Sequence, residues 1–203
     1  MKNGDLLLCD GWIDMLMTKP GKETVVQTQS ALLIIDVQQG LFNVADAEDA
    51  AFLRCIAGLL ERAREQPIPV VYLQHDGGPG QLLEVGTVGW HIHPWIAPHP
   101  EDIVLRKRAS DAFYETPLHE KLQSLGVSRL VVTGADTELC IDSTCRRALS
   151  LDYDVCLVAD GHTTGGTDML NVAQVIEYHN RLLPHVAHPT HAISVQEASA
   201  VQF

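Results

Sequence analysis

Six short runs of apolar residues recur along the chain, and segments with the spacing of amphipathic helices lie between most of them. The runs are apolar throughout, a pattern typical of strands buried on both faces of a parallel sheet. They cover residues 31–36, 69–75, 102–107, 129–134, 154–160 and 192–196, and helices are expected over 46–66, 117–126, 138–151 and 168–183. This alternation predicts an α/β fold: a three-layer α/β/α sandwich around a mainly parallel, Rossmann-like sheet of about six strands.

The chain of 203 residues has the size of one domain with an extended arm. The segment "TKPGKETVVQTQS" (18–30) is polar and rich in turn-forming residues, unlike the periodic sequence that follows it. We therefore expect an N-terminal arm over residues 1–29 and one domain over residues 30–203. No stretch approaches the 18 or more apolar residues of a membrane span, and "LLLCD" near the start is too short for a signal peptide.

The net charge of the chain limits the classes of partner that it can bind. Its 14 basic and 26 acidic residues give a net charge of -12, which disfavours binding to nucleic acid and to anionic membrane surfaces. Five cysteines make an odd number with no Cys-x-x-Cys pair, which fits a reducing compartment better than a disulfide framework. We expect a cytoplasmic protein that acts on a small-molecule substrate.

Three residues with reactive side chains fall at the carboxyl ends of predicted strands. Asp36 ends the first strand, Lys107 ends the third, and Cys140 opens the helix after the fourth. Ligands of open parallel sheets bind at this edge. Each residue taken alone also has a simpler interpretation, namely a loop-capping carboxylate, a solvated lysine and a packed thiol. Their coincidence at one edge favours a functional site.

A thiol at the beginning of a helix is favoured as the thiolate, because unpaired backbone N–H groups lie close to it. The ammonium of Lys107 would lower the pKa of Cys140 further. Asp36 would then accept the thiol proton as a general base. These residues therefore predict a nucleophilic cysteine.

Three segments resemble the isochorismatase-like cysteine hydrolases, a family that also contains nicotinamidases and N-carbamoylsarcosine amidases. They are "LLIIDVQQGLF" (32–42), "KRASDAFYETPL" (107–118) and "VVTGADTELCIDSTCRRALSLDYDVCLVADGHTT" (131–164), and the resemblance extends over residues 30–196. It implies that Asp36, Lys107 and Cys140 form a catalytic triad. It also implies a cis peptide between Ala135 and Asp136, and an oxyanion hole made by the backbone N–H groups of Asp136 and Cys140.

The resemblance implies hydrolysis of a C–N bond, in an amide, carbamoyl or lactam group, through a thioester. Family members that cleave the vinyl ether of isochorismate often lack the cysteine, which is present here. The Asp-x-His metal motif of the nicotinamidases is absent from "QHDGGPG" (74–80), so neither a metal nor another cofactor is expected. The loop "GWHIHP" (89–94) resembles that of a subgroup whose members hydrolyse cyclic or peptide-like amides, streptothricin among them.

The long loop over residues 76–101 carries Trp90 and the pair His91 and His93, which suggests a lid or a pocket wall. Phe42, Trp90 and Phe113 are expected to line the substrate pocket, since apolar rings commonly line ligand sites. The loop and the N-terminal arm are each suited to an interface, so we expect a homo-oligomer, either a dimer or a tetramer. Two other functions remain open: an isochorismatase-type ether hydrolase, and a non-catalytic domain that binds ligands or senses redox state through its thiol.

Overall fold

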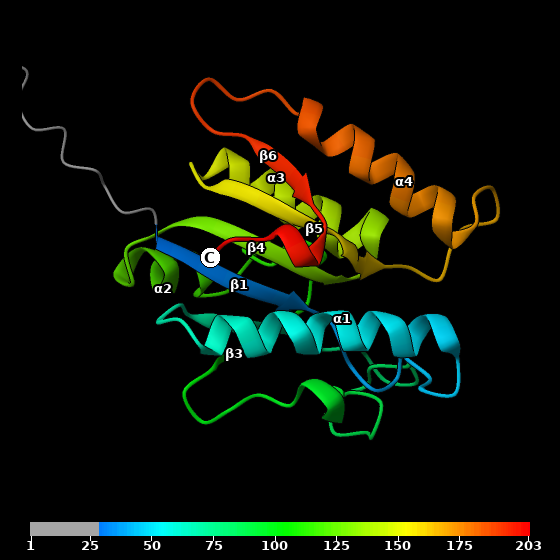
Figure 1. The fold of residues 1–203 in the computed structure, drawn as a ribbon. Helices are drawn as coiled ribbons and strands as arrows, with labels where there is room; N and C mark the ends of the chain where they lie inside the picture. The colour runs from blue at the N-terminus through cyan, green and yellow to red at the C-terminus, as the bar shows by residue number, and fades with distance from the viewer. Residues whose placement is uncertain (1–28) are drawn as a thin grey trace, which may run out of the picture.

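The computed structural model describes residues 29–203. The expected arm over residues 1–29 lies outside this part, apart from Gln29, which begins the first strand. The strands are β1 (Gln29–Ile35), β2 (Val70–His75), β3 (Ile103–Lys107), β4 (Val127–Ala135), β5 (Asp154–Thr163) and β6 (Ile193–Gln196). The α-helices are α1 (Ala47–Arg64), α2 (Leu118–Ser124), α3 (Asp142–Ser150) and α4 (Val172–Leu182) (Figure 1).

All neighbouring strands pair in parallel, in the order β3-β2-β1-β4-β5-β6. The predicted α/β fold with six strands is confirmed. The order of the strands in the sheet could not be predicted from the periodicity of the sequence. The chain runs outward from β1 to β2 and β3, and then returns to place β4 on the other side of β1. A crevice at the carboxyl edge is expected where the direction of winding reverses, which is between β1 and β4.

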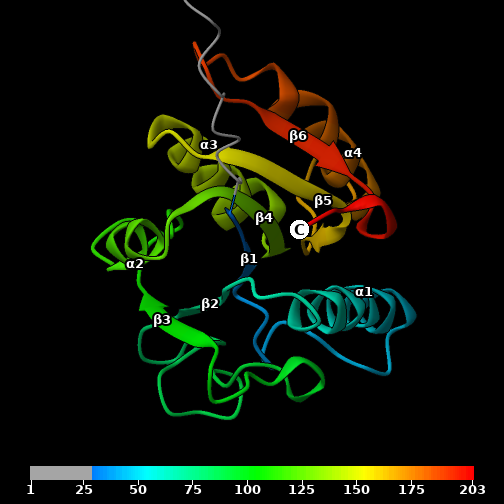
Figure 2. The same cartoon turned by 60° about the vertical axis from the view of Figure 1, so that its left-hand side comes forward.

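The helices cover both faces of the sheet, because each face of the buried strands is apolar (Figure 2). On one face, Leu33 and Ile35 of β1 pack with residues of α2 and α3. On the other face, Leu32 and Ile34 pack with α1 and with Val201 near the C-terminus. Alternate residues of one strand therefore supply two separate cores, as a period of two requires.

The predicted helices form within a few residues of their expected ends, with one exception. The expected helix over 138–151 begins as a π-helical turn, Thr137–Ile141, and becomes α-helical only at Asp142. The helix expected from residue 168 begins at Val172, where Asn171 and Gln174 form a capping box. Within residues 29–203, no helix combines the length and the apolar character that a membrane crossing requires.

Candidate active site

Asp36 follows the last residue of β1 in a conformation that its neighbours impose. Its φ of 55° lies in the left-handed region, which aspartate tolerates better than most residues. Its backbone N–H donates to the carbonyl of Leu73 on β2, at 2.9 Å. On the other side, β4 approaches so closely at Gly134 that a Cβ there would lie 2.0 Å from the carbonyl oxygen of Ile35. This close packing turns the Asp36 side chain into the crevice between β1 and β4.

Lys107 reaches the same point from the end of β3. Its side chain is buried, with 2% of the residue exposed, and its Nζ lies 2.6 Å from Oδ2 of Asp36. The same nitrogen lies 3.2 Å from Sγ of Cys140 and 3.0 Å from the carbonyl oxygen of Ala109. An ammonium has three donors, and these three contacts use all of them. Lys107 is therefore a fixed cation between a carboxylate and a thiol, not a solvated surface lysine.

Cys140 lies in the π-helical turn that follows β4, with 9% of the residue exposed. The peptide bond between Ala135 and Asp136, at the beginning of this turn, is cis, as the family resemblance implies. Thr137 anchors the turn: its hydroxyl lies 2.8 Å from Nδ1 of His162 and 3.0 Å from the carbonyl oxygen of Thr163. The structure thus brings Asp36, Lys107 and Cys140 together, and we refer to them as the thiol cluster.

Burial opposes the thiolate expected at Cys140, whose protonation state stays a prediction. Burial raises the pKa of Cys140 to about 12; the charge of Asp36 adds to this rise and the ammonium of Lys107 opposes it. Burial also raises the pKa of Asp36, and the positive charge of Lys107 opposes that rise. The helix terminus and the lysine favour the thiolate, whereas the loss of solvent, which no local pattern in the sequence records, disfavours it. Burial therefore favours the neutral thiol, which needs a base to become a nucleophile.

Two cavities open at this edge of the sheet. The smaller, of about 200 Å³, is lined by the following residues: Asp36, Leu41, His75, Leu83, Ser110, Ala135, Asp136, Leu139 and Cys140. The larger, of about 490 Å³, lies beside the beginning of α1 and the end of β5. Leu41 and Asp136 line both cavities, so the larger cavity adjoins the smaller one, which Cys140 lines. The role of the Asp136 and Cys140 amides as an oxyanion hole stays a prediction.

Of the three aromatic residues expected in the pocket, the structure places one at a cavity. Phe42 lines the larger cavity and stacks on Phe52, with ring centroids 5.1 Å apart. Phe113 is 9% exposed and packs in the core, where it stacks on Tyr153 at 6.0 Å. Trp90 and Phe113 line neither of the two cavities at the sheet edge.

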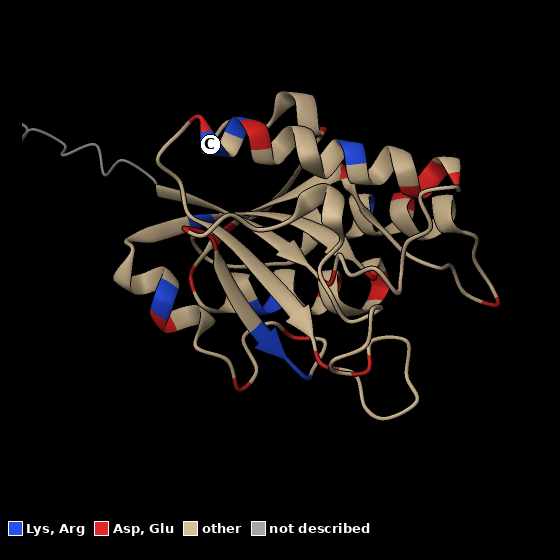
Figure 3. Cartoon of the chain, turned by 90° about the horizontal axis from the view of Figure 1, so that it is seen from below, with Lys and Arg blue, Asp and Glu red and all other residues tan. Residues whose placement is uncertain are grey.

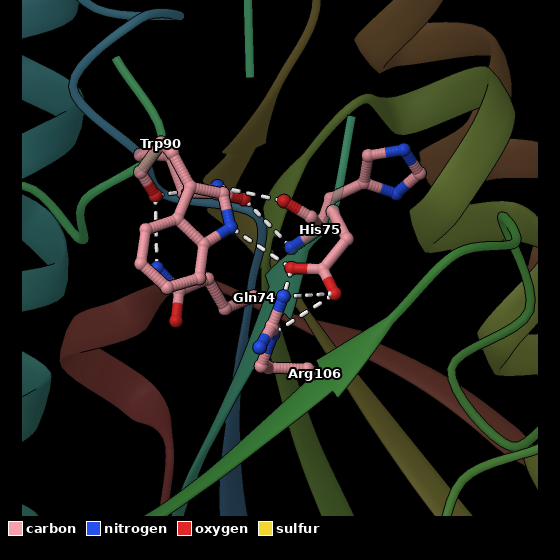
Figure 4. Close-up of polar contacts among 6 residues, drawn as sticks. Gln74, His75, Trp90 and Arg106 are labelled. Carbon is pink, nitrogen blue, oxygen red and sulfur yellow. Dashed lines mark hydrogen bonds and ion pairs between the residues drawn. The ribbon is translucent and has the colours of Figure 1, made fainter. Parts of the chain in front are cut away.

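Trp90 instead joins a set of polar contacts that fastens the long loop to the sheet, and Figure 4 shows its side chain among them. Its indole N–H donates to Oδ1 of Asp76 at 2.9 Å, and the guanidinium of Arg106 pairs with Asp76 and lies over the indole ring. Its carbonyl accepts from the side-chain amides of Gln38 and Gln74, at 2.7 and 2.9 Å. We call these five residues, Gln38, Gln74, Asp76, Trp90 and Arg106, the loop network.

Two histidines at the site were missed in the sequence. His75 ends β2 and lines the smaller cavity, and its imidazole turns away from the loop network (Figure 4). Burial lowers its pKa, and the nearby Lys107 lowers it further. His162 is 2% exposed and connects Thr137 to Asn180, with Nε2 2.9 Å from Oδ1 of the amide. The position of His75 at the carboxyl end of a strand could have indicated that it lies at the site. Nothing in the local sequence indicates the role of His162, because its partners are distant in the chain.

Within residues 29–203, no three His, Cys, Asp or Glu side chains are grouped so as to hold a metal ion. His91 and His93, the loop pair, differ in environment. His93 is buried and its ring accepts from the N–H of Trp95 at the beginning of a short 3-10 helix, whereas His91 is exposed. The expectation that the site uses no metal and no other cofactor stays a prediction.

Comparisons with known proteins find matches in both sequence and fold. The model of the Isochorismatase domain matches residues 30–187. A streptothricin hydrolase from Streptomyces noursei is 40% identical over 152 residues, which are 73% of this chain. The aligned part is 59% of that relative and 49% of a second streptothricin hydrolase from the same organism, so the chain spans about half of their length.

Two further matches cover more of the related protein. A ureidoacrylate amidohydrolase from Methylobacterium radiotolerans is 27% identical over 197 residues, which are 78% of this chain and 76% of that protein. The crystal structure of an isochorismatase from Pseudomonas putida KT2440 matches with a TM-score of 0.73 at 26% identity, covering 86% of this chain and 90% of that chain. The fold and the family signal therefore extend together over most of the described chain.

Proposed function

Because this chain belongs to the isochorismatase family of hydrolases, we propose that it cleaves a C–N bond of a small molecule, with Cys140 as the nucleophile and a thioester as the intermediate. One observation carries the proposal. A buried ammonium, that of Lys107, contacts both the Asp36 carboxylate and the Cys140 sulfur on the wall of a cavity. A carboxylate beside a thiol of raised pKa has the arrangement of a base and its nucleophile.

The first half of the reaction forms the thioester. Oδ1 of Asp36 has no hydrogen-bond partner within residues 29–203, and it is the atom that accepts the thiol proton. The sulfur attacks the carbonyl carbon, and the oxyanion that develops is held by the N–H groups of Asp136 and Cys140. The carbonyl re-forms as the C–N bond breaks, and Asp36 returns the proton to the departing nitrogen. Lys107 keeps the charge of the cluster balanced throughout.

The second half releases the product. Water enters after the amine or ammonia leaves, and Asp36 removes one proton from it as its oxygen attacks the thioester carbon. The C–S bond breaks, the proton returns to the sulfur, and the carboxylic acid leaves. The raised pKa of Asp36 suits this exchange, because burial makes it a stronger base than an ordinary aspartate.

The relatives support a C–N bond as the target. The ureidoacrylate amidohydrolase is an amidohydrolase by name, and streptothricin is the substrate that the names of the two Streptomyces noursei relatives give. Streptothricin, a ureido acid and simple primary amides therefore form the first substrate panel for this chain.

The test is to incubate the protein with this panel and to measure ammonia or amine release, together with the intact mass of the protein. We expect turnover and an acyl adduct on Cys140. Cys140→Ala is expected to lose at least about a thousandfold in kcat/KM with its unfolding midpoint preserved, since triad nucleophiles contribute on that scale. An alanine variant with the wild-type rate, or release of pyruvate from isochorismate in place of amine from any amide, contradicts the proposal.

A further inference from the structure

The larger cavity has an acidic wall. Four carboxylates line it: Asp46, Glu48, Asp49 and Asp136. Among residues 29–203, the other lining residues are glycine, apolar residues, Asn43 and the threonines 163 and 164, with no lysine, arginine or histidine. Figure 3 shows acidic residues at the end of α1 where the helix begins. The wall therefore concentrates negative charge in the cavity that adjoins the one lined by Cys140.

The charges of this wall have no ionic partner. In the part of the chain that the structure describes, none of the four carboxylates forms an ion pair with a lysine, arginine or histidine. Asp46 accepts hydrogen bonds from two backbone N–H groups in the first turn of α1, and Asp49 accepts one from the N–H of Asn43, so both also have a structural role. Within residues 29–203, the side chains of Glu48 and Asp136 accept no such bond, which leaves them available to a ligand.

Asp136 connects the wall to the reaction centre, since it lines both cavities. Burial raises the pKa of Asp136 to about 6, and the charges of Glu138 and Asp36 contribute to this rise. A carboxylate in such surroundings is stabilised by an incoming positive charge.

A second observation marks the adjoining cavity as a place for a ligand. Asp36 is 3% exposed and lines the smaller cavity, yet its Oδ1 has no hydrogen-bond partner within residues 29–203. Buried polar atoms rarely stay unpaired, so a bound donor is expected there. The N–H of an amide substrate fits this requirement, and the rest of that substrate extends past Asp136 along the acidic wall.

We propose that the substrate carries a positively charged group, an ammonium or a guanidinium, which lies in the larger cavity while the scissile carbonyl lies against Cys140. This inference rests on the proposed C–N hydrolysis and names the class of substrate. The acidic wall attracts the cation, and it disfavours anionic amides by like-charge repulsion. Asp136 and Glu48 are the residues that determine the preference.

The test compares three amides of similar length: 6-aminohexanamide, which is cationic, heptanamide, which is neutral, and adipamate, which is anionic. We expect kcat/KM to be at least tenfold higher for the cation than for the neutral amide, and lowest for the anion. In the double variant Glu48→Gln with Asp136→Asn, the ratio of cationic to neutral turnover should fall at least fivefold. Glu120→Gln, an exposed glutamate on α2, is the matched control and should keep the wild-type ratio.

A second measurement separates this inference from the proposed function. Methanethiosulfonate reagents that carry a trimethylammonium or a sulfonate group modify thiols without turnover, and Cys140→Ala corrects for the other four cysteines. Relative to a small free thiol, we expect Cys140 to react at least tenfold faster with the cationic reagent than with the anionic one. If no amide is hydrolysed, the proposed function fails, but the ratio of the two modification rates still measures the preference of the acidic wall for a cation. Equal relative rates, or a ratio unchanged in the double variant, overturn the inference.

Discussion

Two polar clusters lie at the carboxyl edge of the sheet, and they differ in how completely their groups are satisfied. In the loop network, every buried side-chain nitrogen and oxygen has a hydrogen-bond partner. In the thiol cluster, Oδ1 of Asp36 is buried without a partner among the described residues. The first cluster lines neither of the two cavities described above, whereas the second lines one of them.

The difference distinguishes a structural network from a reactive one. The loop network leaves none of its buried side-chain polar atoms unpaired while it holds the long loop, which is the condition for a polar cluster to stabilise a fold. The thiol cluster leaves one acceptor free and keeps a thiol of raised pKa beside it. An unused acceptor costs stability, and it is retained where a substrate or a proton is to be received.

Lys107→Met should produce the largest effect, because it removes the ammonium that pairs with the buried Asp36 carboxylate. We expect the free energy of unfolding to fall by about 3–5 kcal/mol, as when a buried ion pair loses one member, and amide turnover to fall below detection. Denaturant unfolding and kcat/KM measure the two effects.

The double variant Asp36→Asn with Lys107→Met is the control for this experiment. Without the buried carboxylate, it should recover part of the lost stability but none of the activity. Recovery of turnover, or a Lys107→Met protein as stable as wild type, would break the distinction between the two clusters.

The pH dependence of turnover should identify Asp36 as the base. Burial raises the pKa of Asp36 from its ordinary value of 3.8, so its carboxylate form is lost at a higher pH than for an ordinary aspartate. We expect kcat/KM to fall about tenfold for each pH unit below that raised pKa. Burial also raises the pKa of Asp136, to about 6, so protonation of Asp136 could affect the binding of a charged substrate in the same pH range. The measurement therefore uses a neutral amide such as heptanamide. An acid limb that stays flat down to pH 3.8 contradicts the assignment.

Asp76→Asn should produce the smallest effect on activity. The change weakens the contacts of Asp76 with Arg106 and Trp90, and we expect a loss of about 1–3 kcal/mol in the free energy of unfolding. Turnover should stay within about threefold of wild type, because a stability loss of this size leaves the thiol cluster in place. Asp168→Asn, at an exposed aspartate, is the matched control and should change neither quantity. A loss of turnover comparable to that of Lys107→Met would show that the loop network takes part in the reaction.

Much of the fold and part of the site could be predicted from the sequence. Runs such as "ALLIID" (31–36) are apolar on both faces, and only a covered parallel sheet buries both, so the class of fold followed from local pattern. The shared edge of Asp36, Lys107 and Cys140 followed from the same reasoning, because parallel strands end together. The raised pKa of Cys140 did not follow, since burial is a property of the folded chain.

Residues of the same type also took different roles that the sequence does not distinguish. Phe42 and Phe113 are both aromatic and near the triad in sequence, yet Phe42 lines a cavity and Phe113 lies in the core. Trp90 was expected in the pocket and instead holds the loop to the sheet through Asp76. Side-chain direction depends on the packing of neighbouring elements, which no local pattern records.

By itself, the sequence determined the alternation of strands and helices, the net negative charge and the three reactive residues at one edge. These are properties of local pattern and composition, which a chain has before it folds. Only the tertiary structure decided that Lys107 contacts both Asp36 and Cys140, that burial raises the pKa of the thiol, and that four carboxylates meet in one cavity. The physical reason is that distance and solvent exclusion set electrostatic interactions, and both arise only when segments far apart in the chain pack together.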